Sequence, residues 1–431
     1  MKNPSLKKAI AVMVIAMQVM TMSACGEAAN SSSGSTADSG KSGTAGEIEI
    51  YICNDDDLPQ LAIDKIKTDN PGLEVVYDQA SADKYETLLK TRLSAGDAPD
   101  IMTVWPGSRT SDYAQKGYLE PLNDCTFVDR IPETINSEFS WDGDLYALCN
   151  GISAEGLFVN KGILADNGLE VPTDYEQFKN VCKTLQDNGV QPLASGYKED
   201  WVIMRYTNSA FPSLGYAVNP NFDADLDSGK VDFSFEGWRE TFDRFGELLD
   251  AGYFGENLLS TDSSQAIAQF ATGQTAMLIH TIDNVKQVRE TSPDMNLIFT
   301  ALPVNDPGEE RFACSKSSTG YSVSSKSDNK EAAIAFLEAW CDNEINQKIY
   351  TEKGMASPLT DVAVSTVDQT IIDFQDEFVK TGKFALGAHD RWPAGMSNNW
   401  KKKLQEFVGR EITTDEMIEW LNNEYASLSG K

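Results

Sequence analysis

The sequence predicts an α/β protein, and three observations support this fold class. Segments after residue 46 alternate between strand and helix patterns, in the order strand, helix, strand, helix, strand. That order is typical of a parallel sheet whose strands are joined by right-handed crossovers. The strand that ends this run, Asp100–Val104, is short and apolar, as a strand buried on both faces would be. The chain has 431 residues, which is enough for two domains with separate cores.

Local patterns define the elements of the first domain. In order, they are the strand Glu47–Cys53, the helix Leu58–Thr68, the strand Leu73–Tyr77, the helix Ala82–Ser94 and the strand Asp100–Val104. In open parallel sheets, a ligand lies beyond the carboxyl ends of the strands. Trp105 and Arg109 fall at that end, where a flat ring and a planar cation would suit a sugar. Packing in the core explains Trp105 equally well.

The loop after the first strand is acidic. Asn54, Asp55 and Asp56 follow Cys53 directly, and their side chains could accept hydrogen bonds from hydroxyl groups of a ligand. Capping of the next helix, with favourable charge at its N-terminus, explains the same residues equally well.

Further strands and helices are predicted along the rest of the chain. The strands are Leu145–Leu148, Leu157–Val159 and Ala276–Ile279. The helices are one opened by a capping box at Thr173–Glu176 and ending at Asn188, then Phe233–Gly252, Ser264–Phe270, Asn329–Asn343, and a last one opened by a capping box at Thr413–Glu416. Aromatic residues at helical spacing in Phe233–Gly252 predict a core-facing stripe.

The N-terminus is predicted to be a targeting segment. Lysines precede an apolar run, Ala9–Met22, which is too short to span a bilayer. The following Met22–Cys25 resembles a bacterial lipobox, so residues 1–24 would be a signal peptide and Cys25 would be lipidated. Residues 25–45, rich in Ser and Gly, would form a flexible linker. An ordinary secretory signal with a chance cysteine is the alternative.

Composition excludes several classes of partner and cofactor. The formal net charge is −30, so charge would not drive binding to nucleic acid or to an anionic membrane surface. Apart from Cys25, six cysteines remain, without a CxxC pair, and only two histidines are present. We therefore expect no metal site and no cofactor. The spacing leaves both disulfides and buried thiols open, with apolar surroundings favouring thiols slightly.

Four sequence blocks carry a family resemblance. They are AGDAPDI, the run DLYAL…EGLFVNKGIL…GLEVPTDYEQF, FATGQTAM, and GYSVSSKSDNKEAAIAFLEAW…GMASP. With them the chain resembles the extracellular solute-binding proteins of bacterial sugar ABC transporters, the family that contains the maltose-binding protein. The resemblance implies a two-lobe periplasmic-binding-protein-like fold of type II, in which hinged α/β lobes close on a ligand in the cleft between them.

The resemblance also implies a division of the chain. Lobe one would hold residues 46–154 and 301–354, and lobe two residues 155–300 together with C-terminal helices in 355–431. Crossings between the lobes would fall near Ser153–Ala154, Leu302–Pro303 and Gly354–Pro358.

A set of ligand-binding residues follows from the same resemblance. Trp105, Arg109, Glu155, Trp400 and either Asp55 or Asp56 match sugar-contacting positions of the family. His280 to Asp283 replace an expected tryptophan, so Trp201, Tyr197 or Trp392 would supply the missing platform. The full predicted set is Asn54, Asp55, Asp56, Trp105, Arg109, Glu155, Trp201, His280, Asp283, Trp392 and Trp400. A buried helix remains an alternative for Trp201, and a structural role for His280.

The function implied is capture rather than catalysis. We expect a monomeric lipoprotein, anchored through Cys25 to the outer face of the cell membrane, that delivers a neutral oligosaccharide to the permease of an ABC transporter. Malto-oligosaccharides are favoured, with xylo- or fructo-oligosaccharides as alternatives. A secreted glycosidase is a remote alternative because no local signature marks a carboxylate pair. A structural lipoprotein would show repeats, and none is found.

Overall fold

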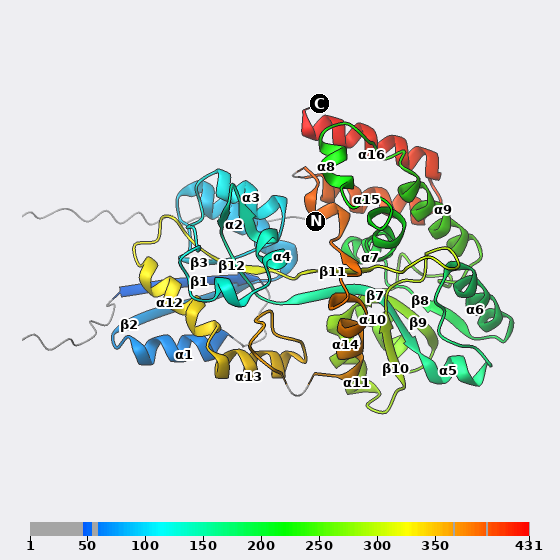
Figure 1. Cartoon of the computed structure of the whole chain (residues 1–431), viewed down its shortest axis with the longest axis horizontal. Coiled ribbons are helices and arrows are strands. Elements are labelled where there is room, and N and C mark those ends of the chain that lie inside the picture. Colours follow the sequence, from blue (N-terminus) through cyan, green and yellow to red (C-terminus); the bar gives the residue numbers. More distant parts are fainter. Residues whose placement is uncertain (1–45, 54–58, 365–366, 394, 431) are drawn as a thin grey trace, which may run out of the picture. The chain divides into compact units, whose positions relative to one another are not determined.

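The computed structural model describes residues 46–53, 59–364, 367–393 and 395–430 (Figure 1). Its first sheet has the strand order β2-β1-β3-β12-β6. The strands are β1 (Gly46–Cys53), β2 (Leu73–Ala80), β3 (Ile101–Val104), β6 (Leu148–Cys149) and β12 (Gly320–Val323). β1 pairs in parallel with β2 and β3, whereas β12 runs antiparallel to β3 and β6. The predicted parallel run of three strands is therefore confirmed.

Helices and a short hairpin surround this sheet. They are α1 (Pro59–Asp69), α2 (Ala82–Ala95), α3 (Ser108–Gln115), η1 (Val128–Arg130), α4 (Glu133–Asn136), η2 (Ser137–Phe139), α12 (Lys330–Trp340), α13 (Asn343–Lys353) and the hairpin β4 (Ser140–Trp141) and β5 (Asp144–Leu145). Figure 1 shows α1, α12 and α13 together beside the sheet, and these three helices contact one another. We call the part of the chain that packs around this sheet lobe one.

The second sheet is built around its longest strand, β7, and we call the part of the chain that packs around this sheet lobe two. Its order is β13-β11-β7-β9-β8, with β10 also paired to β7. The strands are β7 (Ile152–Asn160), β8 (Gln191–Ala194), β9 (Thr275–Thr281), β10 (Leu297–Thr300), β11 (Ala313–Ser317) and β13 (Phe384–Ala385). β7 runs antiparallel to β9 on one edge and to β11 and then β10 on the other. A side chain at Gly156 would overlap the carbonyl oxygen of Thr300, so the close approach of β10 requires glycine there.

Both faces of the second sheet are covered. Leu157 and Val159 of β7 enter one apolar cluster, whereas Ala154 and Phe158 enter another, as expected from the alternation of side chains along a strand. The helices of lobe two are α5 (Lys161–Asp166), α6 (Tyr175–Asp187), α7 (Asp200–Phe211), η3 (Pro212–Tyr216), α8 (Phe222–Asp227), α9 (Glu236–Asp250), α10 (Ser263–Ala271), η4 (Ile282–Asn284), α11 (Val285–Thr291), α14 (Gln369–Phe374), η5 (Gln375–Val379), η6 (Ala388–Arg391), α15 (Met396–Val408) and α16 (Thr414–Ser429). Within the described residues, no helix is long and apolar enough to cross a membrane.

Helix caps follow the sequence closely. Thr413 and Glu416 form the predicted capping box at the start of α16. At α6 the cap is Asp174, one residue later than predicted, because its carboxylate accepts the backbone N–H of Gln177 at 2.8 Å.

Cys149, Cys182 and Cys341 are buried and form no disulfide. Burial raises the pKa of the Cys149 thiol to about 12, so that thiol is protonated.

The crossings between the lobes differ from the expectation at two of three places. The first lies between Cys149 and Ile152, close to the predicted position. The second was expected at Leu302–Pro303, but Leu302 is buried in the core of lobe two and β11 pairs with β7. The chain therefore returns to lobe one at residues 318–319, after β11. The third crossing lies beyond residue 364, because residues 355–364 still contribute apolar side chains to lobe one.

The first two crossings are bonded to each other. The backbone N–H of Asn150 donates to the carbonyl of Thr319 at 2.8 Å, and that of Ser318 donates to the carbonyl of Gly151 at 2.8 Å. Gly151 has a φ of 151°, a backbone conformation that other residues rarely adopt.

The predicted crossing at Leu302–Pro303 was misplaced for a physical reason. β11 (ACSKS) is short and mixed in polarity, so no pattern in the sequence assigns it to a sheet.

Candidate functional site

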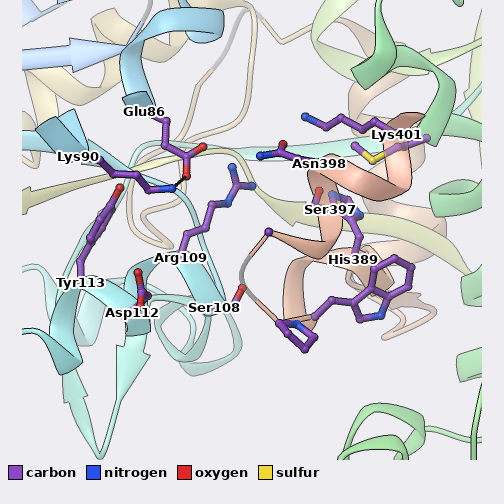
Figure 2. A pocket seen from close by; sticks show the side chains of 14 residues that line it. Glu86, Lys90, Ser108, Arg109, Asp112, Tyr113, His389, Ser397, Asn398 and Lys401 are labelled. Atoms are coloured by element: carbon purple, nitrogen blue, oxygen red, sulfur yellow. Dashed lines mark hydrogen bonds and ion pairs between the residues drawn. The ribbon is translucent and has the colours of Figure 1, made fainter. Parts of the chain in front are cut away.

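A cavity of about 140 Å³ is lined by both lobes. Lobe one contributes residues of α2 and α3, among them Arg109, and lobe two contributes residues of α7, η6 and α15, among them His389 and Lys401. Figure 2 shows the Arg109 guanidinium on one side of the cavity and Lys401, Asn398 and His389 on the other. Of the predicted residues, the cavity wall contains Arg109 and Trp392.

Trp105 and Arg109 form a stacked pair in lobe one. Trp105 directly follows β3 and is half-buried, and the guanidinium carbon of Arg109 lies 5.1 Å from the centroid of its ring. The ring of Tyr85 meets Trp105 edge-on with centroids 5.7 Å apart. The Tyr85 hydroxyl is fixed in turn, because it donates to the carbonyl of Tyr51 at 2.9 Å and accepts from the N–H of Thr103 at 2.8 Å. The sequence placed both residues of the pair at the correct strand end.

A similar pair lies in lobe two. Trp201 and Arg205 are one turn apart on α7, and the Arg205 guanidinium carbon lies 5.2 Å from the Trp201 ring centroid. The alternative of a buried helix is confirmed for most of α7, whereas Trp201 near its start is 39% exposed. Its position on a face with Arg205, rather than with its apolar neighbours, explains the exposure.

Glu155, which the resemblance predicted to contact a ligand, is buried next to this second pair. It is 0% exposed, and its two carboxylate oxygens accept from Arg205 Nη1 and, at 2.9 Å, from Asn208 Nδ2. Asn208 Oδ1 in turn lies 3.0 Å from Nδ1 of His389 in the cavity wall. Glu155 therefore positions Arg205 and, through Asn208, His389.

Trp400 and Trp392, both predicted to bind the ligand, are buried in the core of lobe two. Trp400 is 1% exposed, and its ring lies 6.0 Å from Trp238, 5.7 Å from Phe242 and 5.4 Å from Trp392. Trp392 lines the cavity, but it is itself 2% exposed and packs on Trp238. Neither ring has a free face for stacking on a ligand. Tyr197 is also buried, against aromatic rings of lobe two.

His280 has the structural role that was its alternative. It is buried in β9, where Nδ1 accepts the N–H of Thr281 at 2.9 Å and Nε2 lies 2.9 Å from the hydroxyl of Ser263. The proton is therefore on Nε2. Burial and, to a lesser extent, the positive charge of Arg205 together lower the pKa of His280 to about 3, against a rise caused by Glu155, so the ring is neutral. Asp283 is exposed and accepts from the hydroxyl of Ser153 at 2.7 Å, joining η4 to the start of β7.

Other cavity residues were missed by the sequence reasoning. Lys401 stands in a run of three lysines that resembles an ordinary solvated surface, and Asn398 has no distinguishing context. His389 begins a loop, residues 389–393, whose density of polar and aromatic groups favours a sugar cleft, but the predicted set contained only Trp392 from this loop. The predicted residues Asn54, Asp55, Asp56 and Cys25 lie outside the described residues.

Two lobes, each with its own sheet and core and with a cavity lined by both, define a two-lobe binding-protein fold. Residues 55–347 match the model of the family described as bacterial extracellular solute-binding protein, and the chain belongs to this family.

Relatives with curated names are distant. The "Multiple sugar-binding protein" of Streptococcus mutans is 20% identical over 295 residues, which cover 68% of this chain and 70% of that protein. The "Arabinooligosaccharide-binding protein" of Halalkalibacterium halodurans is 23% identical, over 68% of this chain and 66% of that protein. The match to the "Osmoprotective compounds-binding protein GgtB" of Synechocystis sp. is 29% identical but covers only 31% of this chain and 34% of that protein.

Solved structures show the same fold. A "Chitin oligosaccharide binding protein" superposes with a TM-score of 0.79 at 22% identity, covering 90% of this chain and all of that one. A sugar transporter protein from Bacillus licheniformis in complex with stachyose gives a TM-score of 0.74 at 18% identity, covering 88% and 100%. At these identities the similarity establishes the two-lobe fold.

Proposed function

We propose that this protein binds an oligosaccharide outside the cytoplasm and delivers it to an ABC importer. The observation that carries the proposal is the pair of tryptophan–arginine stacks, one in each lobe. Trp105 with Arg109 and Trp201 with Arg205 each combine an aromatic face with guanidinium donors. A pyranose ring needs that combination, because its C–H faces stack on aromatic rings while its hydroxyls accept and donate hydrogen bonds. The sugar-binding names of the relatives support the same class of ligand.

Contacts from both lobes supply a mechanism for capture. A ligand that touches both stacks would stabilise the conformation in which they approach each other over the one in which they separate. The cavity of about 140 Å³ is smaller than the roughly 300–1,000 Å³ of typical small-molecule sites, so an oligosaccharide would need the lobes to part on entry.

Our proposal for the ligand covers a broader range of oligosaccharides than the sequence-based prediction did. The prediction of malto-oligosaccharides had Trp105 and Trp400 stacking on glucose rings, and Trp400 is buried in the core. We give its role to Trp201 and keep malto-oligosaccharides as one member of a panel. The lipid anchor on Cys25, the monomeric state and the permease partner remain proposals. A Cys25→Ser variant should leave the membrane fraction, and its retention there would contradict the anchor.

Calorimetry tests the binding function. Maltotriose, xylotriose, arabinotriose, raffinose, chitotriose and a fructo-oligosaccharide would be titrated into the wild type, Trp105→Ala and Trp201→Ala. Loss of one stacking platform should cost about 2–4 kcal/mol, roughly a 30- to 1,000-fold loss in affinity. Trp420→Ala is the matched control, because Trp420 is partly buried on α16 and lies against Trp400.

Each outcome has a clear meaning. Equal binding to both platform variants would show that the ligand site lies elsewhere. Release of shorter sugars during incubation would instead favour a glycosidase.

A further inference from the structure

The cavity contains an ammonium group that forms no ion pair with any carboxylate of the described residues. Lys401 of α15 lines the cavity and is half-buried. It forms no hydrogen bond or ion pair with any residue in the described part of the chain. Burial lowers the pKa of Lys401, Arg109 and Arg205 lower it further, and Asp200 and Glu86 raise it. A charge that is partly withdrawn from water is unfavourable until an opposite charge reaches it.

The carboxylates of the cavity wall are already neutralised. Glu86 binds Lys90 at 2.7 Å on α2, and Asp112 of α3 binds the C-cap residue Lys116 at 2.7 Å, each pair being four residues apart. Deeper in lobe two, Glu155 neutralises Arg205. Asp200 raises the pKa of Lys401 but forms no ion pair with it in the described structure.

The polar groups that converge beside Lys401 are donors. Figure 2 shows Lys401 and Asn398 extending from α15 toward the guanidinium of Arg109 on α3. An ammonium, an amide and a guanidinium together offer donors to an acceptor with several lone pairs, and a carboxylate has about four lone-pair sites on two oxygens. The hydroxyl of a neutral sugar could accept one of these hydrogen bonds, but it would leave the positive charge uncompensated.

We propose that the oligosaccharide carries a carboxylate, as a uronic acid unit does, and that Lys401 is its counter-ion. This inference rests on the proposed sugar-binding function, and it replaces the neutral sugar that the sequence predicted. The net charge of −30 opposes the approach of an anion. Salt screens that repulsion beyond about 8 Å, so the groups in the cavity decide the affinity of the bound state.

Matched sugars test the inference. An array of neutral and uronate-bearing oligosaccharides would come first. Calorimetry would then compare xylotriose with glucuronosyl-xylotriose, and galactotriose with trigalacturonate. The proteins are the wild type, Lys401→Met, Lys401→Arg and, as a matched control, Lys402→Met, whose lysine is the exposed neighbour on α15.

The wild type should bind an acidic sugar about 10- to 100-fold more tightly than its neutral match, the effect of one charge-assisted hydrogen bond. Lys401→Met should remove this preference, whereas Lys401→Arg and Lys402→Met should keep it. A neutral sugar that binds as tightly as its acidic match, or a preference that survives in Lys401→Met, would overturn the inference while the sugar-binding function stands. If no sugar on the array or in the titrations binds, both proposals fall.

Discussion

Replacing Glu155 by glutamine should destabilise lobe two by about 3 kcal/mol, the lower end of the range for breaking a buried ion pair. The carboxylate is fully buried and binds both Arg205 and Asn208, whereas the Arg205 side chain is 13% exposed. Glutamine keeps one acceptor oxygen but presents an NH₂ group to the other partner. The Arg205 guanidinium would then be left in a nearly buried site without its counter-charge.

Urea denaturation, followed by tryptophan fluorescence and circular dichroism, measures this loss. Arg205→Met should cost less in the Glu155→Gln background than in the wild type, because the two residues share one interaction. Asp187→Asn, which breaks the exposed ion pair with Lys183, is the control and should cost less than about 1 kcal/mol. If Glu155→Gln costs no more than this control, the carboxylate does not hold Arg205 and the reasoning is refuted.

Two further predictions concern His280 and Trp400. The folded pKa of His280, about 3, lies below its ordinary value of 6.5, so its stabilising contribution is complete above about pH 6.5 and is lost as the pH falls toward 3. Urea unfolding would be measured at pH 7, 6, 5 and 4 for the wild type and for His280→Gln. The free energy of unfolding of the wild type should fall more steeply with decreasing pH, by up to about 1.4 kcal/mol per pH unit. Parallel slopes for the two proteins would contradict the assignment. Trp400→Ala should lower the free energy of unfolding by about 3–5 kcal/mol yet leave the ligand affinity of the folded protein near that of the wild type. Denaturation and calorimetry on the same sample test this, and a selective loss of affinity would return Trp400 to the ligand site.

The three parallel strands of the first sheet could be predicted because the patterns that indicate them are local. Strand alternation, helix patterns and turn residues all lie within a few positions of one another between β1 and β3. The second crossing could not be predicted, because the pairing of β11 with β7 joins residues about 160 positions apart. Nothing in a five-residue strand of mixed polarity indicates such a partner.

Only part of the candidate site could be predicted, again because only some of its residues are positioned by local patterns. Trp105 and Arg109 were placed correctly by the strand end that carries them. Trp400 was assigned to the ligand through family resemblance, although Leu404 and Phe407 follow it at helical spacing and indicate a core face. The burial of Glu155 could not be predicted, because it depends on α7, whose position no local pattern gives.

The hydrogen bonds between the first two crossings affect the mechanics of the protein. Asn150 with Thr319 and Gly151 with Ser318 join the crossings into a two-stranded ribbon. Sliding one strand past the other would break both bonds, whereas twisting or bending the ribbon as a whole would preserve them. The paired crossings therefore connect the lobes in a way that allows bending and twisting but resists sliding. When the lobes close again after opening, the two tryptophan–arginine stacks should therefore return to the same relative position.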